Sequence, residues 1–329
     1  MMKAILFDDF GGADVLRLGD APRPEIRPDD LLVKVMAAGV NRADILQREG
    51  VYGTRCYGDS TLLGLEIAGE VLAIGSAVRG FAVGDRVMGI VGGGAYAQYA
   101  RLDSGMAAKI PAGLSFKQAA AIMESFVTGW EAVGHLGRVD TAETVLIHAA
   151  AGGIGSATVQ LAKASGAHVL ATAASANIDN VLSIGADAVF DYRRSDFEAD
   201  VIDATASHGV DLIVDFVGGA YLARNIRSLA PGGRLVQVGL LGREDNAIIP
   251  LDVVLHNHLQ LIGTVMKSRS RTEKRQMVAR FRDKVLPLLG KSVHPVIGAV
   301  YPFTQVADAH RHMEKGGVFG KVVLEGFHP

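Results

Sequence analysis

Cysteine and net charge are both scarce in this chain of 329 residues. Cys56 is the single cysteine, which excludes a disulfide framework and any zinc cluster built from several thiolates of one chain. The 33 basic and 35 acidic residues leave a net charge of -2. The densest basic stretch, 267–282, is interrupted and is typical of a solvated helix face. Nucleic acid is therefore not expected as a partner.

Long apolar runs are missing as well. No run of roughly 18 or more apolar residues is free of polar breaks, so no membrane-spanning segment and no membrane partner are expected. The N-terminus reaches an acid at Asp8 and lacks the apolar core of a signal peptide. These two absences together predict a cytoplasmic protein.

Glycine, by contrast, is abundant, with 40 residues, and the chain shows two textures. Residues 1 to about 120 form short apolar runs cut by Gly, Pro and Asp, as in 31–35, 69–75 and 84–89. Such punctuation predicts a compact β-rich domain with bulges and tight turns.

From about residue 120 to 270, near-continuous apolar strands alternate with helical patterns. The expected strands are 144–149, 168–173, 188–192, 210–217, 234–240 and 260–266, and the expected helices are 154–165, 177–184, 196–207 and 220–229. This alternation predicts the α/β class, with a doubly wound parallel sheet covered by helices on both faces.

The last segment returns to the first texture. Strands are expected at 296–301 and 321–325, with a helix at 305–315 between them. We expect this tail to close back onto the N-terminal part. The predicted organisation is one domain at 1–119 completed by 288–329, and a cofactor-binding domain at 120–287.

A glycine-rich loop follows the first strand of the alternating region and opens a helix. The segment 146–155 reads LIHAAAGGIG, and Ala150, Gly152 and Gly155 occupy the three positions of a G-x-G-x-x-G motif. Gly152 would let backbone amides approach a pyrophosphate, Gly155 would let helix and strand pack closely, and the helix N-terminus favours phosphate. The alternative is a strand-to-helix turn rich in small residues. The order strand, loop, helix, strand favours a dinucleotide site.

The end of the second expected strand bears on the choice between NAD and NADP. An NAD enzyme usually carries an acid there for the ribose diol, and residues 171–175 read ATAAS. Ala173 therefore permits a 2'-phosphate, to which Ser175 could donate, while Tyr192 and Arg193 follow the next strand. Solvated charge is the alternative for Arg193 and Arg194.

Several further segments resemble one known family over essentially the full length. They are FGG at 10–12 with Val15 and Leu16, AGVNRAD at 38–44, GLEIAG at 64–69, GDRV at 84–87, GGGAYA at 92–97, AAAI at 119–122, the glycine loop, and GKVVL at 320–324. The chain resembles the medium-chain dehydrogenase/reductase superfamily, especially its zeta-crystallin-like quinone oxidoreductases, and within them the tumour-suppressor-induced branch. The resemblance implies a Rossmann domain at 120–287 and a GroES-like catalytic domain for the remainder.

The resemblance also concerns the metal. Zinc-dependent relatives place a Cys where this chain has Asn41 and a His where it has Leu65. Leucine has no donor atom and an amide is a poor zinc ligand, so no metal ligands are expected. Without a Lewis acid, reduction of an already electrophilic acceptor is favoured over alcohol oxidation.

Site residues are implied by resemblance. Asn41 and Thr128 would flank the nicotinamide, and Tyr52 would form the wall of the acceptor pocket; these three are the candidate catalytic residues. The remaining cofactor contacts would come from Gly152, Gly153, Ile154, Ser175, Tyr192, Val217, Leu240, Leu241 and Lys321.

Four of these residues have structural alternatives. Asn41 could simply cap a helix, Thr128 could bond its own backbone, Tyr52 could be a core aromatic and Lys321 a strand-edge charge. Two departures from the family also matter. The Lys that usually follows the serine is absent from 175–178, and residues 53–56 lack the prolines common in relatives.

The predicted function is reduction of quinones or related small electrophiles by hydride transfer from NADPH. NADPH is expected to bind about tenfold or more tightly than NADH. Two alternatives stay open: an enoyl-thioester reductase on the same fold, and a non-catalytic NADPH-binding protein. A homodimer or a larger even assembly is expected, because the final sheet strand at 260–266 is apolar and pairs across a two-fold in relatives.

Overall fold

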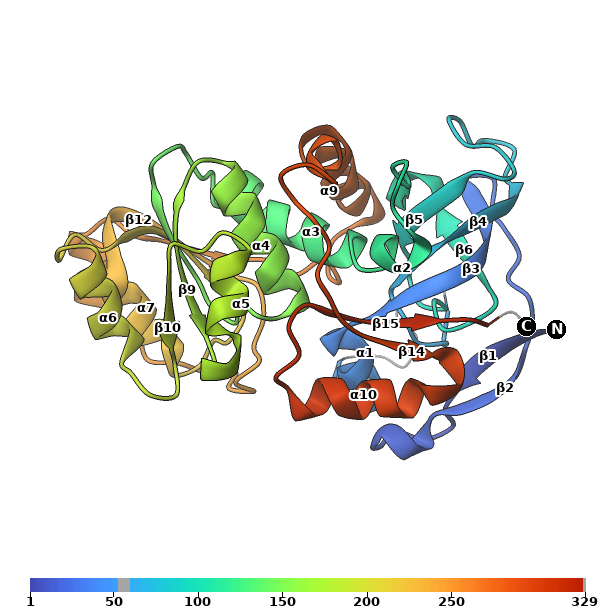
Figure 1. Ribbon diagram of the computed structural model, residues 1–329, viewed down its shortest axis with the longest axis horizontal. Coiled ribbons are helices and arrows are strands. Elements are labelled where there is room, and N and C mark those ends of the chain that lie inside the picture. The colour runs from blue at the N-terminus through green and yellow to red at the C-terminus, as the bar shows by residue number, and fades with distance from the viewer. Residues whose placement is uncertain (53–59, 328–329) are drawn as a thin grey trace. The chain divides into compact units, whose positions relative to one another are not determined.

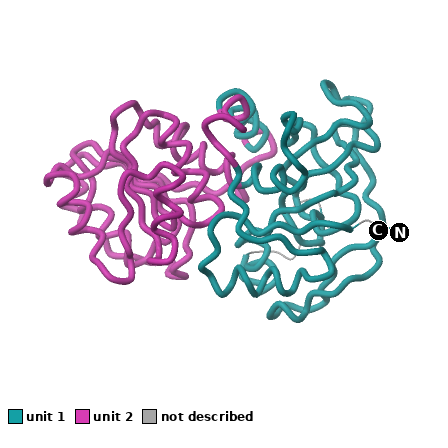
Figure 2. The backbone as a smooth tube through the Cα atoms, in the orientation of Figure 1, with its two compact units in different colours: residues 1–124, 274–284, 295–329 teal, residues 125–273, 285–294 magenta. Residues whose placement is uncertain are grey.

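The structure is a computed structural model that describes residues 1–52 and 60–327. It divides into two compact units (Figure 2). Unit 1 comprises 1–124, 274–284 and 295–329, and unit 2 comprises 125–273 and 285–294. Unit 1 includes 274–284, a segment that lies inside the predicted cofactor-binding domain. The predicted domain boundaries remain a prediction, and each unit is described here by itself.

Unit 1 is built mainly from antiparallel strands. Its strands are β1 (Met2–Leu6), β2 (Arg17–Ala21), β3 (Asp30–Val40), β4 (Glu66–Ile74), β5 (Arg86–Ile90), β6 (Tyr99–Asp103), β7 (Ala107–Lys109), β14 (Ile297–Pro302) and β15 (Lys321–Glu325). Its helices are α1 (Arg42–Arg48), α2 (Phe116–Ala119) and α10 (Val306–Lys315), while α3 (Met123–Trp130) and α9 (Arg271–Lys284) each run across a unit boundary.

The long strand β3 organises this unit (Figure 1). Within the described residues the main sheet has the order β14-β15-β3-β4-β5-β7, with β6 also paired to β3, and β1 and β2 form a separate pair. The tail strand β15 is antiparallel to β3, with Val322 opposite Val40. A segment from the end of the chain therefore lies beside residues 37–40, immediately before α1.

Unit 2 contains a parallel sheet. Its strands are β8 (Thr144–Ile147), β9 (His168–Ala173), β10 (Ala188–Asp191), β11 (Val210–Asp215), β12 (Leu229–Gln237) and β13 (Gln260–Gly263). Its helices are α4 (Gly153–Ala164), α5 (Ile178–Ser183), α6 (Phe197–Ala204), α7 (Tyr221–Ser228) and α8 (Leu251–His256), and a π-helical segment covers Glu131–Leu136.

The strand order of this sheet is β10-β9-β8-β11-β12-β13, and every neighbouring pair is parallel. The order reverses beside β8, which is the doubly wound arrangement of dinucleotide-binding proteins. Figure 1 shows α4 and α5 on one side of the sheet and α6 and α7 on the other. The predicted fold class is confirmed.

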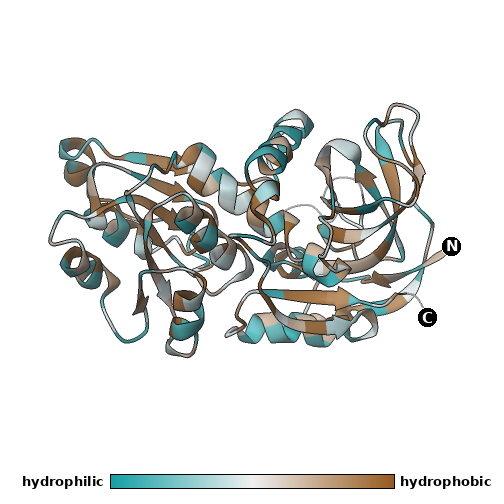
Figure 3. Cartoon of the chain, turned by 45° about the horizontal axis from the view of Figure 1, so that its top comes forward, coloured by the Kyte–Doolittle hydropathy of each residue, from teal (hydrophilic) through white to brown (hydrophobic). Residues whose placement is uncertain are grey.

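The strands of unit 2 form its hydrophobic core, as their colour in Figure 3 indicates. One cluster joins Leu146, Leu170, Phe197, Ile213 and Leu235, each at most 1% exposed. Full burial of such a side chain stabilises the fold by roughly 1.5–3 kcal/mol. Strands buried on both faces explain why the apolar runs are continuous rather than alternating.

Several strand boundaries of unit 2 differ from those predicted, most clearly those of β12 and β13. β12 begins at Leu229 rather than at 234, because a register irregularity lets Leu229 pair with Val210 before the regular ladder starts. β13 ends at Gly263 rather than at 266 and is paired only with β12 in the sheet order. In the described part of the chain, no helix has the length and apolar character needed to cross a membrane.

Candidate active site

The loop between β8 and α4 carries the glycine motif. Gly152 is the N-cap residue of α4, and no side chain caps the helix there. The first N–H groups of a helix have no intrahelical partner, and together with the helix dipole they attract an anion. This end of α4 therefore suits the pyrophosphate of a dinucleotide.

The glycines of this loop serve different purposes. A Cβ on Gly155 would lie 2.2 Å from the carbonyl oxygen of Ala149 and 2.8 Å from the Cα of Ala150. A Cβ on Gly152 would meet nothing closer than the same carbonyl oxygen, at 3.4 Å. Gly155 is thus required for the packing of the helix on the loop, whereas Gly152 leaves space in front of it.

A buried hydrogen-bond chain ties together the strand ends around this loop. His148 Nε2 is 2.7 Å from Asn225 Oδ1, and its Nδ1 is 2.9 Å from the hydroxyl oxygen of Thr172. Asn225 Nδ2 donates to Asp215, which also accepts the N–H of Val217 at 2.6 Å. Burial lowers the pKa of His148, which keeps the imidazole neutral, with Nε2 as donor and Nδ1 as acceptor. Hydrogen bonds between side chains therefore hold the carboxyl ends of β8, β9 and β11 together, and none of these residues occupies a position of the glycine motif.

Ser175 and Tyr192, the residues predicted to bind a 2'-phosphate, lie after β9 and β10, which are neighbouring strands. The Ser175 hydroxyl donates a hydrogen bond to Asp191, the last residue of β10. Tyr192 is 39% exposed, and the Arg193 guanidinium lies 5.5 Å from its ring centre. Asp191 is not among the predicted site residues, because the acid of an NAD enzyme is expected at the end of the second strand, and Asp191 ends the third.

Val217, Leu240 and Leu241 lie in the loops after β11 and β12. The N–H of Leu241 donates to the carbonyl of Phe216, and the N–H of Gly242 donates to that of Val217, both at 2.9 Å. Leu240 and Leu241 are 48% and 47% exposed. The structure thus brings these three predicted residues together at the carboxyl ends of β11 and β12, although their contact with a cofactor remains a prediction.

Thr128 and Tyr52 do not belong to these loops. Thr128 is partly buried on α3, one residue before Gly129, where that helix packs on Thr158 of α4. Tyr52 is partly buried and is the last residue before the gap in the description. The segment 53–56, expected to shape the pocket rim, lies outside the described residues.

In unit 1, Asn41 belongs to a buried polar cluster. It occupies the N-cap position of α1, where its backbone N–H donates to the Asp44 carboxylate at 2.8 Å. Its side-chain amide has other partners: Nδ2 donates to Glu66 Oε1 at 3.2 Å, and Oδ1 accepts from Lys321. Asn41 is 9% exposed, and its amide is held by residues distant in sequence rather than by the helix alone.

Glu66 is the centre of this cluster. It is fully buried and forms an ion pair with Lys321, which is 3% exposed. Its second oxygen accepts the N–H of Glu124 at 2.9 Å. A Cβ on Gly39 would lie 2.2 Å from the Glu66 carboxylate, so the glycine makes room for the acid. Burial, followed by the Glu66 charge, raises the pKa of Glu124 to about 8.

Lys321 was expected to reach the cofactor from the tail. Its ammonium contacts Glu66 and Asn41, and its contact with a cofactor remains a prediction. Glu66 was not singled out from the sequence, although it stands within the family-like segment 64–69. The pairing of β15 with β3 is what brings Lys321 to Asn41.

Asp44 is also part of a second buried group, which contains Tyr96, His310 and Arg48. The Tyr96 hydroxyl donates to Asp44 at 3.0 Å and is 3.2 Å from His310 Nε2, while Arg48 contacts His310 Nδ1 at 3.2 Å. Burial raises the pKa of Asp44 to about 7 and lowers that of His310 to about 3. Both groups are therefore largely neutral near pH 6.

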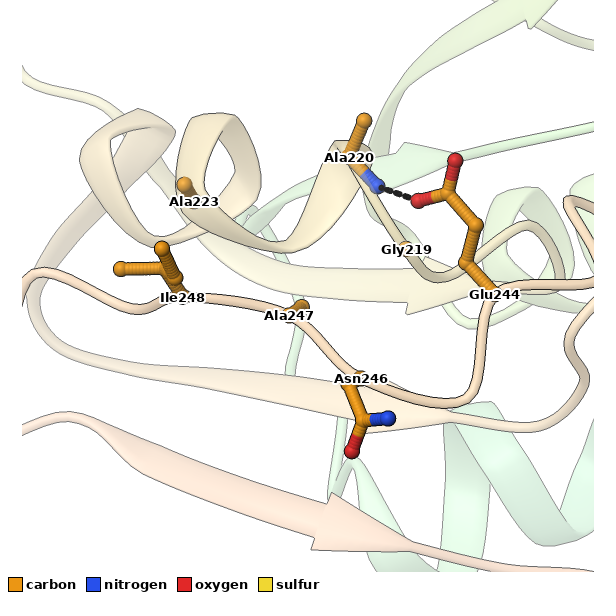
Figure 4. Close-up of a pocket in the computed structure, with 7 residues that line it drawn as sticks. All are labelled: Gly219, Ala220, Ala223, Glu244, Asn246, Ala247 and Ile248. Carbon is orange, nitrogen blue, oxygen red and sulfur yellow. Dashed lines mark hydrogen bonds between the residues drawn. The ribbon is translucent and has the colours of Figure 1, made fainter.

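Figure 4 shows a surface cavity of about 280 Å³ beside the start of α7. Its lining includes Gly219, Ala220, Glu244 and Ile248, and Glu244 accepts the N–H of Ala220 at 3.0 Å. None of the predicted site residues lines it. Across residues 1–52 and 60–327, no group of three or more His, Cys, Asp or Glu side chains is arranged to hold a metal ion.

Several known proteins are similar to this chain in sequence and in fold. Residues 27–112 match the family of the alcohol dehydrogenase GroES-like domain, and residues 153–283 match that of the zinc-binding dehydrogenases. Human quinone oxidoreductase is 33% identical over 332 residues, covering 98% of each chain. The structure of a quinone oxidoreductase from Coxiella burnetii is 31% identical, with a TM-score of 0.80 and 99% of each chain covered. The CurK enoyl reductase is 25% identical, with a TM-score of 0.87 and coverage of 98% and 99%.

The chain therefore belongs to the medium-chain dehydrogenase/reductase superfamily, with the quinone oxidoreductases among its homologues. It is an oxidoreductase, and its family implies a nicotinamide dinucleotide cofactor. Membership of the tumour-suppressor-induced branch stays a prediction.

Proposed function

We propose that this protein reduces quinones or related small electrophiles with hydride from NADPH and without zinc. The observation that carries the proposal is the uncapped N-terminus of α4 behind Gly152, in a chain that aligns with quinone oxidoreductases over almost its whole length. That helix end suits a pyrophosphate, and the homologues supply the acceptor class.

The residues have distinct proposed tasks. Amides at 152–154 bind the pyrophosphate, while Ser175 and Tyr192 hold the adenosine ribose phosphate. Val217, Leu240 and Leu241 line the nicotinamide half of the site. Asn41 and Thr128 orient the nicotinamide, and Tyr52 forms the acceptor wall. We also propose the predicted Lys321 contact.

The bound dinucleotide supplies a hydride, and one proton from water completes the conversion of quinone to hydroquinone and NADPH to NADP⁺. The protein mainly orients the reactants and excludes water.

Independence from zinc is supported by the two positions where zinc relatives carry ligands. Leu65 is 3% exposed and has no donor atom, and the Asn41 amide is already bonded to Glu66 and Lys321. The activity should survive chelation and dialysis, and metal analysis should find much less than one zinc per chain. One zinc per chain after that treatment would contradict this part of the proposal.

A panel of acceptors tests the reaction. Stopped-flow consumption of NADPH should be fast with small quinones and slow with crotonyl thioesters. The reverse result would favour an enoyl-thioester reductase, a candidate supported by the likeness to the CurK enoyl reductase. If the protein binds NADPH but reduces neither class, it would be a non-catalytic NADPH-binding protein.

A homodimer is also proposed, and the edge of the unit 2 sheet supports it. Leu251 and Leu255 on α8 are 68% and 71% exposed, and Leu261 on the edge strand β13 is 40% exposed. Exposed apolar side chains beside an open strand edge favour pairing with a second copy. Light scattering should give twice the chain mass at micromolar concentration, whereas a monomer there would contradict the proposal.

A further inference from the structure

The carboxylate of Asp191 lies opposite the end of the second strand of the unit 2 sheet, a strand end that itself carries no acid. The second strand of the unit 2 sheet ends at Ala173, which lacks the acid that an NAD enzyme uses to bind the ribose diol. In the parallel register of β9 and β10, the residue opposite Ala173 is Asp191. Strand β10 therefore places an acid beside the end of β9, where β9 itself has none.

Asp191 also bonds directly to a residue of the proposed cofactor site. Its Oδ2 accepts the hydroxyl proton of Ser175, and its Oδ1 accepts the N–H of Arg193 at 3.0 Å. Arg194 Nε lies 3.7 Å from Oδ2. The Ser175 bond first, then the Arg193 amide, holds the pKa of this carboxyl below its ordinary value. Asp191 is therefore ionised at neutral pH.

The hydrogen bond has a consequence for Ser175. A hydroxyl has one proton to donate, and here that proton is given to Asp191. Ser175 cannot give the same proton to a 2'-phosphate while Asp191 stays ionised. The carboxylate itself repels a phosphate but accepts a hydrogen bond from the free 2'-hydroxyl of NADH.

We propose that Asp191 is a specificity-determining residue, which disfavours dinucleotides with a 2'-phosphate and favours those with a free ribose 2'-hydroxyl. This inference rests on the proposed binding of the adenosine ribose at Ser175 and Tyr192. Asp191 holds the NADPH preference below the tenfold that Ala173 and Tyr192 favour without it.

The decisive variant is Asp191→Asn, which keeps the shape and an oxygen acceptor for the Arg193 amide but removes the charge. Titration by fluorescence should show NADPH binding about tenfold or more tightly than to the wild type, because roughly one charge is removed from beside a group carrying nearly two. NADH binding should stay the same or weaken a few-fold. Asp203→Asn is the matched control, since this exposed acid on α6 gives the same change in net charge. It should leave both affinities unchanged.

Ser175→Ala tests the same inference without altering Asp191. In the wild-type background it should change NADPH affinity less than about twofold, because the Ser175 proton is not available to the phosphate. In the Asp191→Asn background it should weaken NADPH binding by roughly tenfold or more, the minimum expected of a hydrogen bond to a charged group. A tenfold loss in the wild-type background would overturn the inference, even if no variant of Asp191 could be purified.

An unchanged ratio of NADPH to NADH affinity in Asp191→Asn would overturn this inference and leave the proposed function intact. A wild-type protein that prefers NADH, together with a variant that prefers NADPH, would contradict the proposed donor and support the inference. A wild-type protein that binds neither dinucleotide would overturn both.

Discussion

The dinucleotide loop of unit 2 and the polar cluster of unit 1 are built from different chemical groups. The loop offers backbone amides at the start of α4, with glycines that decide how closely other atoms approach. The cluster consists of the side chains of Asn41, Glu66 and Lys321, joined across 280 residues of sequence. A site made from backbone leaves one contiguous motif, whereas a site made from distant side chains is divided among separate segments of the sequence. The two regions should therefore fail in different ways when they are altered.

The largest effect is expected from breaking the buried ion pair. Lys321→Met leaves the fully buried Glu66 carboxylate without its cation, which should lower the free energy of unfolding by about 3–5 kcal/mol. Urea denaturation measures this, and the exposed Lys315→Met should change it by less than about 0.5 kcal/mol. Adding Glu66→Met to Lys321→Met should restore part of the loss. Equal stability of the two lysine variants would show that the pair contributes nothing.

The loop glycines should separate packing from binding. Gly155→Ala should cost about 1–3 kcal/mol of stability, because its Cβ would lie 2.2 Å from a backbone oxygen. Gly152→Ala should fold normally and yet bind dinucleotide less tightly, because its Cβ fills only the space in front of the loop. Thermal unfolding and fluorescence titration of both variants test this contrast. If both lose stability equally, the two glycines do not have different purposes.

Asp44, which accepts the backbone N–H of Asn41, should give the stability of the protein a pH dependence that the dinucleotide loop does not. Its pKa is raised by burial to about 7, so the native state binds this proton more tightly than the unfolded chain does. The stability from that proton is present at low pH and is lost as pH rises toward 7.

Compared with Asp44→Asn, the wild type should therefore lose about 1.4 kcal/mol per pH unit between roughly pH 4 and 7. Urea denaturation of both proteins at pH 5, 6 and 7 measures the difference, from which the titration of His310 cancels. A difference that stays constant with pH would show that the Asp44 carboxyl titrates normally.

The smallest effect is expected at the exposed edge of the dinucleotide site. Tyr192→Phe should weaken NADPH binding by a few-fold and leave NADH nearly unchanged, because a hydrogen bond to a phosphate in partial contact with water contributes about 1 kcal/mol. Fluorescence titration with both dinucleotides measures it. Equal losses for NADPH and NADH would place Tyr192 elsewhere in the site.

The sequence by itself determined the fold of unit 2. The alternation of apolar strands and helices predicted a doubly wound sheet, and its expected strand 168–173 matches β9. The glycine loop was found for the same reason, because its strand, turn and helix are contiguous. Both are local patterns, and hydrophobic periodicity and glycine conformation act over a few residues.

The tertiary structure alone decided which side chains meet. Asp191 lies opposite Ala173 because β9 and β10 pair in one particular register, which the sequence of either strand does not specify. Lys321 reaches Glu66 because β15 pairs with β3 and because Gly39 leaves space for the acid. Register and long-range pairing result from the packing of whole sheets, so the sequence of each separate segment does not show which distant residue becomes its neighbour.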